Sequence, residues 1–179
     1  MHILINYVAF QLGWLAAVLG GANQLPWLGT TVAMAVVLVH LHFANQPSRE
    51  LQLIAVAAAI GALWDSLLVA LGWLTYPSGT LIIGTAPHWI IAMWIMFATT
   101  LNVSLRWLKQ RWVLAAVLGA IAGPLAYYAG HELGGVQFAD PGMALAALGV
   151  GWAVIMPLLV ALSDRFDGFQ RHQLKQRYA

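Results

Sequence analysis

A single carboxylate lies within one of the most apolar stretches of this 179-residue chain. Asp65 stands in GALWDSLLVALGW, residues 61–73. Burying an ionised acid at membrane depth costs about 2.5–3.5 kcal/mol on insertion scales, so such a residue usually has a partner and a function. His88 and His131 are expected at a similar depth, and an acid beside a neutral imidazole can act as a general acid–base pair. We therefore predict Asp65, His88 and His131 as the catalytic group, with a neutral or purely structural Asp65 as the alternative.

Other polar side chains are expected to form a pocket around Asp65. Tyr127 and His131 are four residues apart and share one helical face, as do Tyr128 and Glu132. The predicted pocket faces the outer side of a membrane, and its lining residues are Tyr127, Tyr128, Glu132, Trp64, Gln11, Thr99 and Asn102. Toward the inner side, His40 and His42 are interpreted as interfacial residues whose rings reach toward water.

Three classes of function fit these residues. The first is a lipid-handling protein, either an enzyme or an accessory factor, in which a cavity between helices admits an acyl chain. The second is a small proton-linked transporter in which Asp65 exchanges a proton. The third is a haem or metal protein with His88, His131 and Glu132 as ligands, although no HxxxH or HExxH spacing supports it. We rank the lipid function first and predict no cofactor.

The elements that must position these residues are transmembrane helices. Hydrophobic residues make up 61% of the chain and charged residues 8%, against about 25% charged residues in soluble domains. A span needs about 20 mostly apolar residues, and polar, Pro and Gly breaks divide the chain into six of them. The sequence predicts an all-α bundle with spans at 3–22, 26–43, 51–74, 85–107, 112–131 and 142–162.

The basic residues predict how these spans are oriented. All eight Lys and Arg fall in alternate connections and in the C-terminal segment, and the first, third and fifth connections carry none. Because cytoplasmic loops are enriched in Lys and Arg, we expect both termini in the cytoplasm. The tail, residues 163–179, is expected to lie along the inner leaflet. So few basic residues give no nucleic-acid surface, and the absence of cysteine excludes disulfides and thiolate chemistry.

Two local patterns predict helix geometry near the site. Gly119 and Gly123 form a GxxxG pair, which lets helices approach closely, and Pro124 is expected to kink the same span. In the fourth span, Pro87 suits the first helical turn and Thr85 suits the cap before it.

Five stretches of the chain resemble a known family: NYVAFQLGWLAAVLGGA (6–22), PWLGT (26–30), LWDSLL (63–68), PHWIIAMWIMFATTLNVSLRWL (87–108) and GAIAGPLAYYAG (119–130). The family is the bacterial inner-membrane family known as domain of unknown function 2878. Its relatives are often encoded beside cyclopropane-fatty-acid-synthase-like methyltransferases and other lipid or light-stress genes. The resemblance implies a multi-pass inner-membrane protein, and this gene neighbourhood favours a part in fatty-acid or phospholipid modification. Expected partners are membrane lipids, a lipid-modifying enzyme and further copies of the chain.

Overall fold

Proline and glycine mark most of the helix boundaries in the computed structural model, which describes residues 3–170. Pro26, Pro47 and Pro141 each occupy the first turn of a helix, where their missing N–H costs nothing. Within the described residues the elements are α1 (Ile3–Ala22), α2 (Pro26–Phe43), α3 (Pro47–Ala70), β1 (Leu74–Thr75), α4 (His88–Leu101), the 3-10 helix η1 (Arg106–Leu108), α5 (Trp112–Glu132), β2 (Gln137–Phe138) and α6 (Pro141–Arg165). The predicted all-helical architecture is confirmed.

Two of the predicted ranges differ from the observed helices by more than three residues at an end, and those of α5 and α6 differ by one to three residues. Helix α3 begins at Pro47 rather than 51 and ends at Ala70 rather than 74, because it includes a polar first turn and stops before Gly72, whose φ is +73°. Helix α4 has 14 residues rather than the 23 of the range 85–107. Pro87 is its N-cap residue, and the Thr85 hydroxyl donates to the carbonyl of Ile82 instead of capping the helix.

Side chains from other helices explain why α4 ends at Leu101. Asn102 donates to Glu50 Oε1 at 2.8 Å and the N–H of Ser104 donates to Asn6 Oδ1 at 3.3 Å. Backbone can leave the helix at membrane depth when protein groups satisfy it. At 1.5 Å per residue α4 is about 21 Å long, shorter than the roughly 30 Å of a bilayer core.

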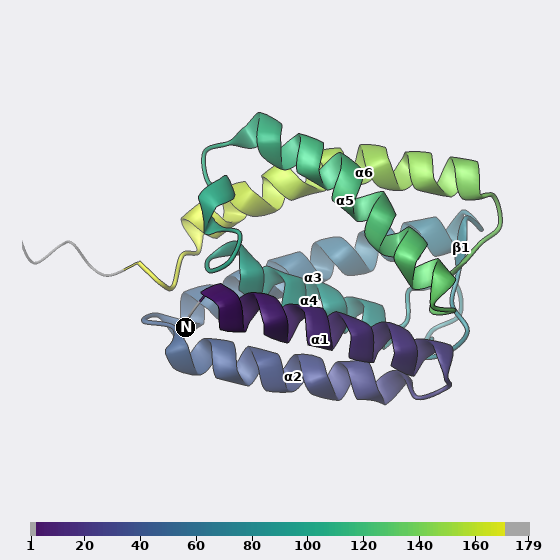
Figure 1. The fold of residues 1–179 in the computed structure, drawn as a ribbon, viewed down its shortest axis with the longest axis horizontal. Helices are drawn as coiled ribbons and strands as arrows, with labels where there is room; N and C mark the ends of the chain where they lie inside the picture. The colour runs from purple at the N-terminus through teal and green to yellow at the C-terminus, as the bar shows by residue number, and fades with distance from the viewer. Residues whose placement is uncertain (1–2, 171–179) are drawn as a thin grey trace, which may run out of the picture.

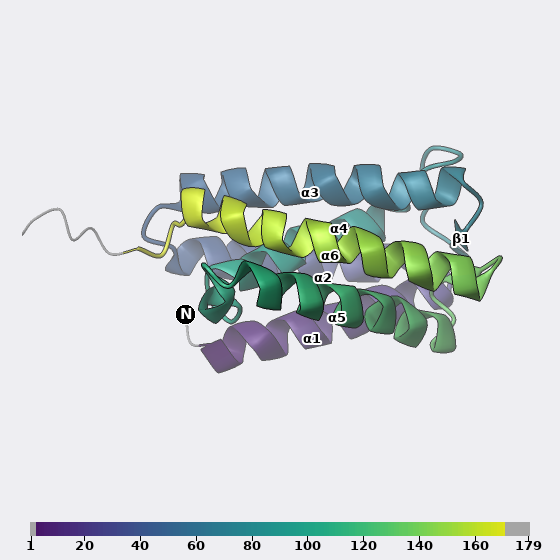
Figure 2. The same cartoon turned by 90° about the horizontal axis from the view of Figure 1, so that it is seen from above.

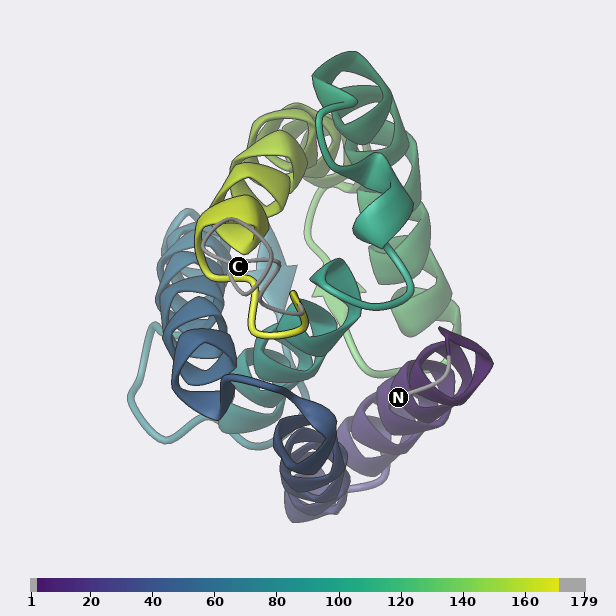
Figure 3. The same cartoon turned by 90° about the vertical axis from the view of Figure 1, so that its left-hand side faces the viewer.

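Helix α4 lies at the centre of the bundle (Figures 1 and 3). It packs against α1, α2, α3 and α6, whereas α5 packs mainly on α6. The helices run along the long axis of the molecule, so that connections gather at two ends (Figure 2). The strand end holds residues 71–87 and 133–140, where β1 and β2 pair antiparallel.

The other end, which we call the basic end, holds residues 44–46, 102–111 and 166–170. The N–H of Gln46 donates to the carbonyl of Gly168, and Asn102 Nδ2 donates to that of Phe166, which ties these three segments together. All Lys and Arg among the described residues lie at or beside this end: Arg49, Arg106, Lys109, Arg111 and Arg165.

Five helices, α1, α2, α3, α5 and α6, are long and apolar enough to cross a membrane. Large apolar side chains cover their outer faces, and Leu63, Val113 and Val150 are each more than two-thirds exposed. Soluble proteins rarely expose apolar surface on this scale. The chain is therefore a multi-pass membrane protein.

Candidate functional site

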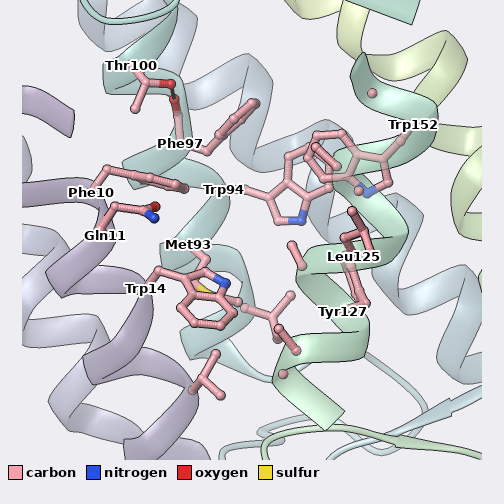
Figure 4. A pocket seen from close by; sticks show the side chains of 18 of the residues that line it. Phe10, Gln11, Trp14, Met93, Trp94, Phe97, Thr100, Leu125, Tyr127 and Trp152 are labelled. Atoms are coloured by element: carbon pink, nitrogen blue, oxygen red, sulfur yellow. Dashed lines mark hydrogen bonds between the residues drawn. The ribbon is translucent and has the colours of Figure 1, made fainter. Parts of the chain in front are cut away.

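A cavity of about 580 Å³ lies between α1, α4, α5 and α6. In Figure 4, Gln11 and Trp14 of α1 face Tyr127 of α5 across it. Its wall consists largely of aromatic and small side chains, and its volume falls within the roughly 300–1,000 Å³ of ligand pockets. The aromatic lining residues are Tyr7, Phe10, Trp14, Tyr76, Trp89, Trp94, Phe97, Tyr127 and Trp152.

Near both ends of the cavity, other segments of the chain are in contact with α1. At the strand end, Gly135 lies so close to α1 that an added Cβ would stand 2.9 Å from Val18 Cγ1. At the basic end, buried Asn6 of α1 donates to the carbonyl of Thr99 at 3.1 Å and accepts from the N–H of Ser104. These contacts fasten α1 to α4 and to the segment that follows it.

The side of the cavity between α1 and α5 is open. Tyr7 of α1 is 53% exposed and Leu125 of α5 is 59% exposed, yet both line the cavity. Gln11 and Ala122 are likewise exposed lining residues. In the end-on view of Figure 3, α1 and α5 stand apart on this side. The opening therefore faces the surface that lipid would cover.

Asp65 lies behind the cavity wall, is fully buried and accepts three hydrogen bonds. Tyr127 Oη donates to Oδ1 at 2.6 Å, Tyr76 Oη donates to the same atom at 3.1 Å, and Trp94 Nε1 donates to Oδ2 at 2.6 Å. All three donors line the cavity. Burial raises the pKa of Tyr76 well above its usual value, and the charge and hydrogen bond of Asp65 add to the effect, so the phenol keeps its proton.

Glycines make room for two of the tryptophan rings that line the cavity. The ring of Trp94 occupies the place of a side chain at Gly61 of α3, and Trp152 of α6 does the same at Gly123 of α5. Trp94 and Trp152 stack with their ring centroids 4.7 Å apart and their planes 11° apart. Gly123 thus admits the Trp152 ring between α5 and α6, and Gly119, the other glycine of the GxxxG pair, packs against the Trp152 backbone and Met156.

The two histidines predicted to act with Asp65 have other partners. His88 Nδ1 lies 2.7 Å from Thr30 Oγ1, and its ring stacks on Trp27 with centroids 4.1 Å apart. His131 Nδ1 lies 3.0 Å from the carbonyl of Val136. The structure therefore joins Asp65 to Tyr127, Tyr76 and Trp94, and places both histidines in separate contacts at the strand end.

The predicted pocket residues fall into three groups. Gln11 and Tyr127 line the cavity. Trp64 packs on Gly151, Thr99 donates to the carbonyl of Met96, and Asn102 donates to Glu50. Tyr128 and Glu132 are exposed. Among residues 3–170, no three His, Asp or Glu side chains gather as metal ligands would, so His88, His131 and Glu132 do not form a metal site there.

The interpretation of His40 as an interfacial residue is wrong. His40 is fully buried at the basic end, and its Nε2 lies 2.8 Å from Oε2 of Glu50, which is also fully buried. Glu50 Oε1 accepts from Asn102 and, at 2.6 Å, from the N–H of Gly168. His42, two residues on, is exposed as expected.

Sequence reasoning missed Glu50 because it belongs to the polar stretch 44–50, which the sequence predicts to be a connection rather than part of a helix. A signal was present, however. Pro47 starts α3, and Glu50 then falls on the stripe that also carries Ile54, Ala57, Gly61 and Asp65, which are all buried. Two buried acids on one helical face therefore mark the inward side of α3.

Asp167 forms a second ionic cluster at the basic end. Arg106 and Lys109 reach its carboxylate at 2.6 and 2.7 Å. Burial alone would raise the pKa of Asp167, but the hydrogen bond and charge of Lys109, the N–H of Phe169 and the charge of Arg106 outweigh it and lower that pKa. The part of the predicted tail at 171–179 lies outside the described residues.

No curated protein and no solved structure matches the chain. A family model described as "Protein of unknown function (DUF2878)" matches residues 3–158, most of the chain and five of its helices together with most of α6. The cavity and the Asp65 cluster both lie within the matched region. The chain belongs to the DUF2878 family.

Proposed function

We propose that this protein crosses a bacterial inner membrane six times, with both termini in the cytoplasm, and takes part in the modification of a membrane fatty acid or phospholipid. It does so as the enzyme or as the accessory of one, by holding part of the lipid in the cavity between α1 and α5. Two sets of observations support the proposal: the charge distribution, and the shape and lining of the cavity.

The charge distribution supports the topology. The Lys and Arg of the described residues lie at the basic end, and cytoplasmic loops carry such an excess. The start of α1 and the end of α6 lie at that same end (Figure 1). Helix α4, though short, crosses together with the segment 102–108, whose backbone groups find protein partners.

The absence of cysteine from the chain gives a direct test of topology. Single cysteines at Asn45 and Gln110 of the basic end, and at Asn23 and Thr80 of the strand end, would be labelled with a membrane-impermeant maleimide in whole cells. We expect labelling of the strand-end cysteines alone until the cells are opened. Labelling of Asn45→Cys in intact cells would overturn the orientation.

The laterally open, apolar cavity is the observation that carries the lipid function. Because exposed residues of α1 and α5 line the cavity, a ligand would enter between these two helices from the lipid side. Its hydrocarbon part would contact the aromatic wall, where burial contributes about 25 cal/mol per Å² of apolar surface. The phenols held by Asp65 are the polar groups that would meet a reacting or recognised atom of the lipid.

A comparative lipidome tests this function. Cells that lack the gene would be complemented with the native chain, with Ala122→Phe, which fills the cavity, or with Ile121→Phe. Ile121 is the matched control because it is adjacent, 56% exposed and outside the cavity lining. We expect the native chain and Ile121→Phe to restore a lipid that Ala122→Phe does not. An unchanged lipidome in cells lacking the gene, under ordinary growth and under light stress, would refute the function.

A further inference from the structure

The charge of the cavity lining restricts what part of a lipid can enter. Among the described residues that line it, none is Lys, Arg, Asp, Glu or His. Asp65 lies behind the wall with both oxygens occupied by protein donors. An ionised group placed in the cavity would lose its hydration without an ionic partner, which costs several kcal/mol. The part of the ligand inside the cavity is therefore uncharged.

The hydrogen bonds of the lining residues restrict the ligand further. The indole N–H groups of Trp89 and Trp94 already donate to Ser78 and Asp65, and the Thr100 hydroxyl donates to the carbonyl of Phe97. Tyr76 and Tyr127 give their protons to Asp65. A phenol that donates to a carboxylate keeps lone pairs on its oxygen, and chains of hydrogen bonds strengthen one another.

The two phenol oxygens can therefore each accept a hydrogen bond from a donor on the ligand. Opposite Tyr127, the exposed Gln11 presents an amide, which can donate and accept (Figure 4). A hydroxyl group fits between such partners, because it donates one hydrogen bond and accepts others. The indole N–H of Trp152, which also lines the cavity, is buried without a hydrogen-bond partner among the described residues. An ester or ether oxygen could accept from that N–H but could donate nothing to the phenol oxygens, whereas a hydroxyl can do both.

We propose that the lipid group bound in this cavity is a hydroxyl on an otherwise uncharged hydrocarbon chain, whose proton is donated to the Tyr127 or Tyr76 oxygen. This rests on the proposed function and narrows its substrate class. The hydroxyl can belong to a free long-chain alcohol, or to a hydroxylated acyl chain of a phospholipid whose charged head remains outside the opening. Both ligands place the same groups in the cavity, a hydroxyl and an uncharged hydrocarbon chain.

Brominated probes would test this, because bromine quenches tryptophan fluorescence at short range and Trp14, Trp94 and Trp152 line the cavity. The full chain in nanodiscs would be titrated with a brominated long-chain alcohol, its methyl ether, the carboxylic acid of equal length, and a phospholipid with a brominated hydroxyacyl chain. Concentrations would be expressed as mole fractions in the bilayer, which removes differences in partitioning. In Ala122→Phe the cavity is filled, so the quenching that remains in this variant comes from the tryptophans that face lipid and gives the background.

We expect at least one hydroxyl probe to bind about tenfold more tightly than the ether and the ionised acid. Whichever hydroxyl probe binds identifies the source. Tyr127→Phe should reduce the alcohol-over-ether ratio at least threefold and leave ether binding unchanged. Equal binding of alcohol and acid, or an undiminished alcohol-over-ether ratio in both Tyr127→Phe and Tyr76→Phe, would overturn the proposal. If every probe binds alike and Ala122→Phe blocks them all, the proposed lipid function stands and this inference fails; if none binds above background, both fail.

Discussion

Replacing Asp65 with Asn tests the cluster behind the cavity wall. The native carboxylate accepts from two phenols on Oδ1 and from one indole on Oδ2. In Asp65→Asn the amide oxygen can still accept from the phenols, but the amide nitrogen then faces the Trp94 N–H. One buried donor loses its acceptor, which costs about 1–3 kcal/mol, and the remaining bonds lose the strength that the charge gave them.

For a chain of this size a loss of 1 kcal/mol lowers the unfolding midpoint by about 2–4 °C, so we expect Asp65→Asn to lower it by about 2–12 °C. Thermal unfolding of the purified protein in detergent, followed by tryptophan fluorescence, measures this shift. Asp65→Leu should lower the unfolding midpoint further than Asp65→Asn does, because it leaves three buried donors without an acceptor. Asp65→Asn should also fail to restore the lipid in cells that lack the gene.

A double-mutant cycle measures the energy of the Asp65–Tyr127 hydrogen bond separately from the other effects of each substitution on stability. Tyr127→Phe removes one donor and keeps the ring, and the loss of a hydrogen bond to a charged group costs about 1.5–3 kcal/mol. Because the two side chains share one bond, the double variant should be less destabilised than the sum of the single variants. An Asp65→Asn protein as stable as the native chain would refute the assignment of Asp65 as a charged acceptor of three bonds.

Three further predictions concern packing and the basic end. Gly123→Ala should lower the unfolding midpoint, because the new Cβ would overlap the Trp152 ring, and such overpacking costs about 1–3 kcal/mol. Gly149→Ala is the control: its Cβ would lie 3.5 Å from the nearest atom outside its own helical turn, so this variant should be neutral or stabilising. Equal effects of the two substitutions would contradict the packing described for Gly123. Glu50→Ala should cost about 3–5 kcal/mol, since it leaves His40 and the Gly168 N–H without their acceptor and takes from Asn102 one of its two acceptors. A shift of the unfolding midpoint no larger than that of exposed Glu132→Ala would refute this. Asp167 has a folded-state pKa below its unfolded value of about 3.9, so its contribution is complete above that value and is lost as the pH falls through the folded pKa. Asp167→Asn should therefore lower the unfolding midpoint at neutral pH and make no difference in strong acid, and a pH-independent effect would contradict the ionic cluster.

The sequence predicts the long helices well because each carries its own signals. Helices α1 and α2 cover the same residues as the predicted spans, since the polar break NQLP and the prolines at 26 and 47 mark their ends. Helix α4 could not be predicted in this way. Its end depends on Asn6 and Glu50, which are distant in the sequence and reach it only after the bundle has assembled.

The candidate site was predictable only in part, for a related reason. Hydropathy singles out Asp65, and the i, i+4 spacing draws attention to Tyr127, which does donate to Asp65. The sequence does not predict Trp94 as a partner of Asp65, because tryptophan counts as an apolar residue although its indole N–H can donate a hydrogen bond. The contact of Trp94 with Asp65 also depends on Gly61 of another helix, which leaves room for the ring. His88 and His131 share a membrane end with Asp65, but depth alone does not say which helical faces meet.

Native mass spectrometry of the purified protein tests the central claim most directly, because it detects a lipid that remains bound in the cavity. The native chain, Ala122→Phe and Ile121→Phe would be extracted from the same membranes under identical conditions. We predict a bound lipid on the native chain and on Ile121→Phe, and its loss from Ala122→Phe while all three proteins keep the same unfolding midpoint. The same lipid, equally abundant on all three, would contradict a binding site between α1 and α5.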